Sequence, residues 1–217
     1  MTPRLLVVAH GTASLEGSAT TSAVVDRIRA ARPGVRVDLC FLDVAVPRLP
    51  DALDDSPTVL VPLLLSTGYH VQSDIPATIA PFSNVRVARH LGPHGLLIDA
   101  LVDRLQPSEG ETTVLVGAAS SRPEAAVELA ETGRALAERL DQDVPVLTIT
   151  GALRPELAAI PGPLQVATYL LAEGQFLQTL HAAVDGLGRV APPLGGHPSI
   201  VDLVWLRYDA ARVTEPV

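Results

Sequence analysis

The sequence contains no lysine. All sixteen basic residues are arginine, against 24 acidic residues, and the formal net charge is −8. Without lysine the chain has no Walker-type phosphate lysine and no Schiff-base lysine, which excludes P-loop nucleotide use and pyridoxal phosphate chemistry. Aromatic residues make up only 3% of the chain. An acidic chain so poor in aromatics lacks the basic, aromatic-laced face that nucleic-acid binding needs.

Cysteine and long apolar runs are also scarce. The single cysteine, Cys40, allows no internal disulfide and no thiolate metal cluster. It lies in an apolar strand pattern, which favours a small buried hydrophobe over a reactive thiol. No apolar run approaches the ~20 residues that cross a bilayer, and the apolar segment near the N-terminus is too short for a signal peptide. We therefore expect a cytoplasmic protein that does not bind membranes.

Short aliphatic runs alternate with longer amphipathic segments, a pattern that predicts a mainly parallel sheet with helices on both faces. Strands are expected at 5–9, 35–43, 58–65, 85–90, 112–117, 144–150, 164–171 and 189–191. Helices are expected at 18–31, 71–80, 95–105, 123–140, 175–184 and 198–208.

The second half of the chain repeats the first. "HLGPHGLLIDALVDRL", from His90, matches "PLGGHPSIVDLVWLRY", from Pro193, and "VVAHGTAS" parallels "LVGAASS". A polar stretch at 106–112 marks the boundary between the copies. The sequence thus predicts an α/β fold made of two similar four-stranded halves, residues 1–106 and 112–217, related by a pseudo-twofold duplication.

Two apolar runs each end at a histidine. "LLVVAHG" holds His10 after the first expected strand, and "LLLSTGYH" holds His70 after the third. Ligands collect outside the carboxyl ends of parallel strands, so both imidazoles would overhang one crevice if these strands are neighbours. Two neutral imidazoles can hold Fe²⁺, Co²⁺, Ni²⁺ or Zn²⁺, and two ligands are too few for a permanent structural site.

The duplication separates these two histidines from the scaffold. His10 aligns with Ala118 and His70 with Phe176, so the second copy has neither imidazole. A site role would be needed only once, whereas a core role could be kept in both copies. The other reading is that each histidine only caps a loop.

Two carboxylates stand near the expected site. Asp74 follows His70 by four residues and on a helix would share its face, where it could accept the second ring N–H; a first-turn acid stabilised by the helix dipole is the equal alternative. Asp43 ends a strand at the same predicted edge and could accept protons or approach the metal, or be a solvated loop acid. His94 and His197 occupy matched places before equivalent helices, which favours a structural role.

"VVAHG", "VPLLLSTGYHVQSDIP" and "LGPHGLLIDALVDRL", in this order, resemble the ATP-independent class II sirohydrochlorin chelatases in their long, two-repeat form. The resemblance covers nearly the whole chain. It implies insertion of Co²⁺, Fe²⁺ or, in some members, Ni²⁺ into a precorrin-derived tetrapyrrole by a cytoplasmic lyase, in sirohaem or cobalamin biosynthesis. The metal is then a co-substrate, and no nucleotide is used.

The resemblance also implies roles for individual residues. His10 and His70 match the family's metal ligands, with Asp43 as a further catalytic group and Asp74 behind His70. Residues expected to contact the substrate are Gly11, Thr12, Ser66, Thr67, Gly68, Tyr69 and His94. The chain departs from the family where Thr12-Ala13 replaces the usual Ser-Arg and where Asp43 replaces a glutamate.

Which arginines hold the substrate carboxylates is open, with Arg86, Arg89 and Arg122 as candidates. A duplicated chain can build alone the two-lobed cleft that short members make by dimerising, so we expect a monomer or a homodimer.

Three other functions remain in view. A metal or tetrapyrrole carrier on the same fold would bind without turnover. A hydrolase is disfavoured because no Gly-x-Ser-x-Gly elbow is present. A dinucleotide enzyme is disfavoured because the Gly186–Ala191 fingerprint precedes a strand instead of following one.

Overall fold

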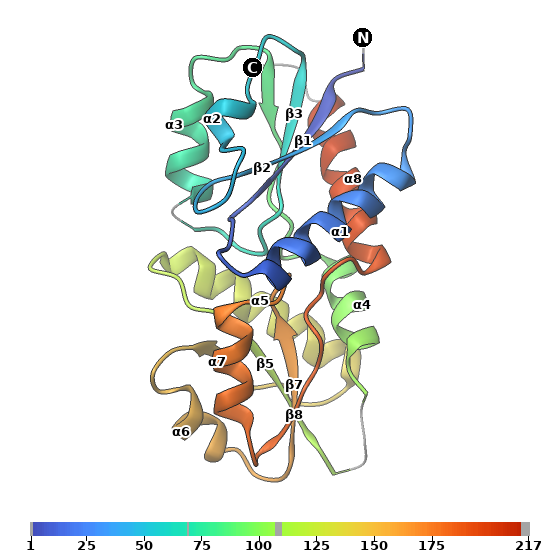
Figure 1. Ribbon diagram of the computed structural model, residues 1–217. Helices are drawn as coiled ribbons and strands as arrows, with labels where there is room; N and C mark the ends of the chain where they lie inside the picture. Colours follow the sequence, from blue (N-terminus) through green and yellow to red (C-terminus); the bar gives the residue numbers. More distant parts are fainter. Residues whose placement is uncertain (1, 69, 107–109, 214–217) are drawn as a thin grey trace.

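The computed structural model describes residues 2–68, 70–106 and 110–213. Within them, eight strands form two four-stranded sheets, in the order β2-β1-β3-β4 and β6-β5-β7-β8, and all paired strands are parallel. Figure 1 shows the two halves stacked along the long axis, the first above the second. The predicted α/β duplication is confirmed.

The elements of the first half follow the expected alternation. They are β1 (Arg4–Ala9), α1 (Leu15–Ala31), β2 (Val37–Phe41), α2 (Leu49–Ala52), β3 (Thr58–Pro62), the π-helical turn η1 (His70–Asp74), α3 (Ile75–Ile79), β4 (Val85–Val87) and α4 (Gly95–Arg104).

The second half has the same order. Its elements are β5 (Thr112–Ala118), α5 (Pro123–Leu140), β6 (Val146–Ile149), α6 (Leu153–Ala158), β7 (Leu164–Tyr169), α7 (Gln175–Val184), β8 (Gly188–Val190) and α8 (Pro198–Val213).

The central strands are buried on both faces, as helix-covered parallel strands must be. Every residue of β1, β3 and β7 is buried. Cys40 lies in β2 with no exposed surface, and burial raises the pKa of its thiol to about 12. It is a buried hydrophobe, as its strand pattern predicted.

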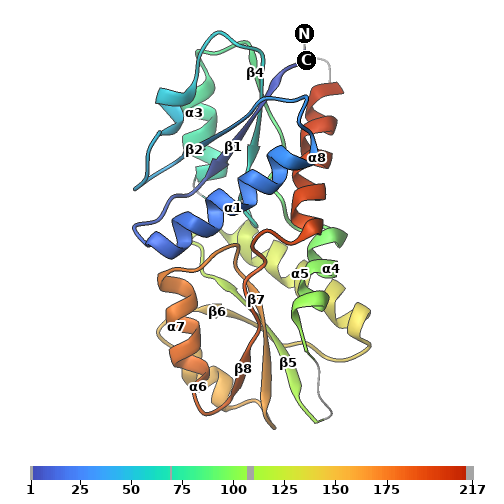
Figure 2. The same ribbon diagram turned by 45° about the vertical axis from the view of Figure 1, so that its right-hand side comes forward.

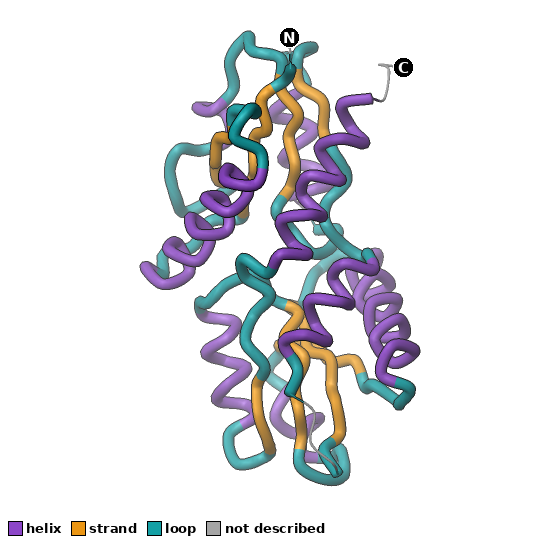
Figure 3. Tube along the Cα trace, turned by 90° about the vertical axis from the view of Figure 1, so that its right-hand side faces the viewer, coloured by secondary structure: helices purple, strands orange, loops and turns teal. Residues whose placement is uncertain are grey.

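The last helix of each half packs on the other half. Helix α4 contacts α5 and β7, whereas α8 contacts α1, β3 and β4. In Figures 2 and 3 helix α8 runs beside the first sheet. Trp205 of α8 donates its indole N–H to the carbonyl of Ile28 at 3.2 Å, and Tyr208 donates to the carbonyl of Pro3 at 2.6 Å. This exchange joins the two halves through one continuous apolar core.

The sequence-based expectations were incomplete for the short helices. Helices α2 and α6 were not predicted, and the helix expected at 71–80 is divided into η1 and α3. Among the described residues, no helix is long and apolar enough to cross a membrane.

Candidate active site

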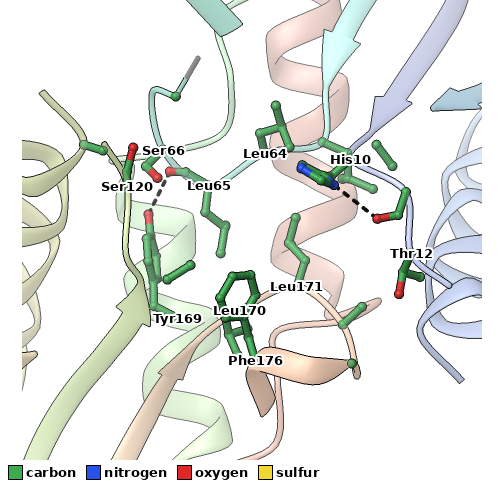
Figure 4. Close-up of a pocket in the computed structure, with 18 of the residues that line it drawn as sticks. His10, Thr12, Leu64, Leu65, Ser66, Ser120, Tyr169, Leu170, Leu171 and Phe176 are labelled. Carbon is green, nitrogen blue, oxygen red and sulfur yellow. Dashed lines mark hydrogen bonds between the residues drawn. The ribbon is translucent and has the colours of Figure 1, made fainter. Parts of the chain in front are cut away.

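A cavity of about 520 Å³ lies between the halves, at the carboxyl ends of both sheets (Figure 4). Its volume is in the range of small-molecule sites. The loops after β1 and β3 form one side, and those after β5 and β7 form the other. The lining consists of residues 9–12, 63–68, 118–120 and 169–176, together with Thr21, Val71, Ala125 and Leu129. Most of these residues are apolar.

His10 stands on the wall of this cavity. Strands β1 and β3 are neighbours, with Val8 opposite Pro62, so their ends meet at one edge as expected. The exposed His10 ring has Nδ1 3.2 Å from the carbonyl oxygen of Gly11. A carbonyl only accepts, so this contact requires a proton on Nδ1, and in that tautomer Nε2 has the lone pair that can bind a metal.

Gly11 is required by the way the loops meet. Its φ is +97°, and a Cβ placed there would lie 1.9 Å from the carbonyl oxygen of Asp43. The Asp43 N–H in turn donates to the carbonyl of His10 at 2.9 Å. A residue without a Cβ therefore lets the loop after β2 support the backbone beneath His10.

The Asp43 side chain contacts Val44 and Arg48. Its Oδ1 accepts from the Val44 N–H at 2.8 Å and pairs with the Arg48 guanidinium at 3.2 Å. The structure brings the Asp43 backbone to His10, but Asp43 is not among the residues that line the cavity. Its catalytic role stays a prediction.

The loop after β3 carries most of the other predicted residues. Ser66, Thr67 and Gly68 line the cavity beside Gly11 and Thr12.

Tyr69 lies outside the described residues, and so does the side chain of His70, whose backbone begins η1. Asp74 ends η1, is half-buried and does not line the cavity. In the described part of the chain, no three histidine, cysteine, aspartate or glutamate side chains gather as a metal site.

His94 has a different place. Its Nδ1 accepts the Leu96 N–H at 3.1 Å and so caps α4, away from the residues that line the cavity. Burial, with Arg207 and Arg89 nearby, holds the pKa of His94 below its usual value. In the second repeat His197 accepts the Ser199 N–H at 3.2 Å in the same way. The matched histidines thus share a capping role.

The sequence model of CbiX matches residues 4–108. The match covers the first half of the chain, which is therefore similar to CbiX. This confirms the resemblance to sirohydrochlorin chelatases.

Related proteins extend the CbiX match. The sirohydrochlorin ferrochelatase of Priestia megaterium is 28% identical over an alignment 136 residues long, and the match covers 55% of this chain and 51% of that relative. The chain thus spans about half the length of this relative. The structure of SirB from Bacillus subtilis with Fe³⁺ has a TM-score of 0.82 at 19% identity, covering 98% of this chain and 96% of SirB. SirB from Bacillus subtilis subspecies spizizenii in complex with cobalt gives 0.80 at 21%, with the same coverage. These likenesses show the fold.

Sequence reasoning missed what the second half contributes to this cavity. Ala118 and Phe176, the counterparts of the two histidines, both line it. Phe176 is 52% exposed although it is a large apolar residue. Tyr169 donates its hydroxyl across the halves to the carbonyl of Leu65 at 3.1 Å, and burial raises the pKa of this phenol to about 12. The alignment of the repeats could have identified the first two.

The three candidate arginines lie apart. Arg122 of the second half reaches the Ser73 hydroxyl in η1 at 3.4 Å, so it approaches the segment that begins with His70. Arg86 donates to the carbonyl of Arg212 at 2.7 Å, and Arg89 is exposed. None of the three lines the cavity.

A buried polar cluster behind the cavity joins the halves. Thr67, after β3, donates its N–H and its hydroxyl to the carboxylate of Glu128 on α5, at 2.6 and 2.9 Å. His90 Nε2 lies 3.0 Å from the same carboxylate. Burial lowers the pKa of His90 although Glu128 favours the charged ring. His90 is therefore neutral near pH 7, with its Nε2–H donating to Glu128.

Proposed function

We propose that this protein is a lyase that inserts a divalent metal, Co²⁺ or Fe²⁺, into sirohydrochlorin or a related tetrapyrrole without ATP. The observation that carries the proposal is His10 on the wall of an otherwise mostly apolar cavity between two parallel sheets. The relatives support it, since one is a sirohydrochlorin ferrochelatase and SirB has been described with Fe³⁺ and with cobalt.

In this proposal His10 and His70 hold the incoming metal. A site with two protein ligands binds loosely enough to give the ion up, because a permanent site generally has four. The metal passes to the ring nitrogens of the macrocycle one bond at a time. Two pyrrole protons leave as the dication enters, so charge balances without an oxidant or a phosphoryl donor. A released imidazole or Asp43 would accept these protons.

The apolar lining suits a flat macrocycle. Phe176 and the leucines after β7 would face one side of the ring system, opposite the His10 wall. The carboxylates at the ring edge would extend toward the mouth of the cavity, where a cation such as Arg122 can meet them.

Anaerobic turnover tests this function. The wild type is mixed with sirohydrochlorin and Co²⁺, Fe²⁺ or Ni²⁺, and the absorbance change of the macrocycle is followed. His10→Ala and His70→Ala should each lower the rate at least ~100-fold, beyond the ~10–100-fold cost of losing an outer-shell partner. Their circular dichroism should stay unchanged. Full activity in either variant would refute the assignment.

The same assay separates the enzyme from a carrier. A carrier would bind the metal and the macrocycle tightly and release no metallated product. Size-exclusion chromatography of the active protein would distinguish the monomer from the homodimer. The cytoplasmic location, the absence of nucleic-acid binding and the division at residues 106 and 112 stay predictions.

A further inference from the structure

Glu128 has no role in the chemistry described above, yet its carboxylate is more fully engaged than that of a typical surface helix glutamate. Three donors converge on it: the Thr67 N–H, the Thr67 hydroxyl and the His90 ring N–H, all within 3.0 Å. The Glu128 side chain is 15% exposed and that of His90 is 7% exposed. Charge-assisted bonds in a place shielded from water are among the strongest that a protein makes.

This contact joins the two halves and has a counterpart. Helices α1 and α5 start at equivalent positions, which makes Thr20 the counterpart of Glu128; likewise Glu173 is the counterpart of Thr67. The Thr20 hydroxyl donates to the Glu173 carboxylate. Each half therefore holds the loop of the other through a threonine–glutamate pair, with the two residue types exchanged between helix and loop.

The two pairs hold different loops. Glu173 belongs to the loop that leads to Phe176, whereas Thr67 belongs to the loop that leads to His70. Both hydrogen-bond donors of Thr67 point to Glu128, and Thr67 is 9% exposed. Two bonds from one residue to one carboxylate fix both the backbone and the side chain at the start of this loop.

We propose that Glu128 is a positioning residue for metal delivery: through Thr67 it sets the place of the His70 segment relative to the second half. The inference rests on the proposed function, since it takes His70 as a metal ligand. The second half has neither metal histidine, but in this proposal it takes a direct part in forming the metal site through Glu128. Glu128 itself does not touch the metal.

The test compares two variants of Glu128 with two controls. Glu128→Ala removes the acceptor, and Glu128→Gln keeps its length but turns an amide N–H₂ toward one of the donors. Thr20→Ala breaks the counterpart pair at the same interface. Glu131→Gln changes an exposed glutamate three residues further along α5. Metal affinity is measured by titration with Co²⁺ alone, from its visible absorption, and thermal stability by differential scanning calorimetry.

Glu128→Ala should raise the Co²⁺ dissociation constant ~10–100-fold, the usual cost of losing an outer-shell partner, with a smaller rise for Glu128→Gln. In turnover it should lower kcat and leave the KM for the macrocycle little changed. Thr20→Ala should lower the melting temperature but keep the dissociation constant within ~2-fold, because it acts at a separate site. Glu131→Gln should change neither quantity.

Other outcomes of these measurements would contradict the proposal. If both Glu128 variants melt earlier and bind Co²⁺ like the wild type, Glu128 only joins the halves and the proposal is wrong. If Glu128→Ala does not fold, the dissociation constant of Glu128→Gln decides alone. If the wild type binds Co²⁺ without turnover, the chelatase function fails, while the Co²⁺ titrations still decide the role of Glu128.

Discussion

Phe176 provides the sharpest test of where the macrocycle lies. This residue is the second of α7, lines the cavity and is 52% exposed. If the macrocycle covers it, this exposed surface is removed from water on binding. We therefore expect Phe176→Ala to weaken substrate binding and to leave the metal site intact.

The size of the effect follows from the exposed area. A phenylalanine buries roughly 200 Å² when fully covered, so about half of that, ~100 Å², is available to the substrate. At ~25 cal/mol per Å² this area is worth up to ~2.5 kcal/mol, or ~70-fold in affinity. If the macrocycle covers half of the available surface, the effect is ~10-fold. The expected rise in KM is thus between ~10-fold and ~70-fold.

Initial rates over a range of sirohydrochlorin concentrations, at saturating Co²⁺, measure KM and kcat separately. We expect kcat to change little, because Phe176 makes no contact that grows in the transition state. Val127→Ala is the matched control, since Val127 is a 58% exposed apolar residue on α5 outside the cavity. An unchanged KM in Phe176→Ala, together with loss of activity in His10→Ala, would show that the macrocycle does not lie against α7.

Two further predictions concern stability. Gly11→Ala should lower the free energy of unfolding by roughly 2–5 kcal/mol in urea denaturation, because its Cβ would overlap the Asp43 carbonyl in a left-handed backbone; Gly34→Ala, with open space around it, should change it by less than ~1 kcal/mol, and equal losses would contradict the reasoning. Because the pKa of His90 is lowered by folding, the unfolded chain binds more protons, so the unfolding free energy should fall as the pH drops below ~6.5. This decrease should be smaller in His90→Asn, and a slope equal to that of the wild type would contradict it.

Strands and helices could be predicted from the sequence where an aliphatic run or a helical periodicity extends over the whole element. All eight strands overlap the predicted ranges, β1, β3, β5 and β7 are rich in aliphatic residues, and α5 and α7 have the predicted bounds. Helix α2 was missed because four residues with a proline at the second position carry no periodicity. Pro76 divides the helix expected at 71–80, since it has no N–H for the carbonyl of Gln72 and is accepted only in a first turn.

The exchange of α4 and α8 between the halves was beyond sequence reasoning. An apolar stripe shows that a helix packs, but the same stripe fits either sheet. The site residues also differ in how far they could be predicted from the sequence. His10 was found because a strand end fixes where its side chain emerges. Glu128 lies on an amphipathic helix, where its sequence context is that of a solvated residue, and its partner Thr67 is 61 residues away in the chain.

The asymmetry of the duplicated halves follows from the stoichiometry of the proposed reaction. A tetrapyrrole has one set of ring nitrogens and accepts one metal, so a second pair of histidines across the cavity would have nothing to deliver. Where that pair is dispensable, apolar residues at its positions would improve binding of the proposed macrocycle, and Ala118 and Phe176 stand there. The second half must still hold the His70 loop in place, which requires the Glu128 contact but no imidazole at either strand end.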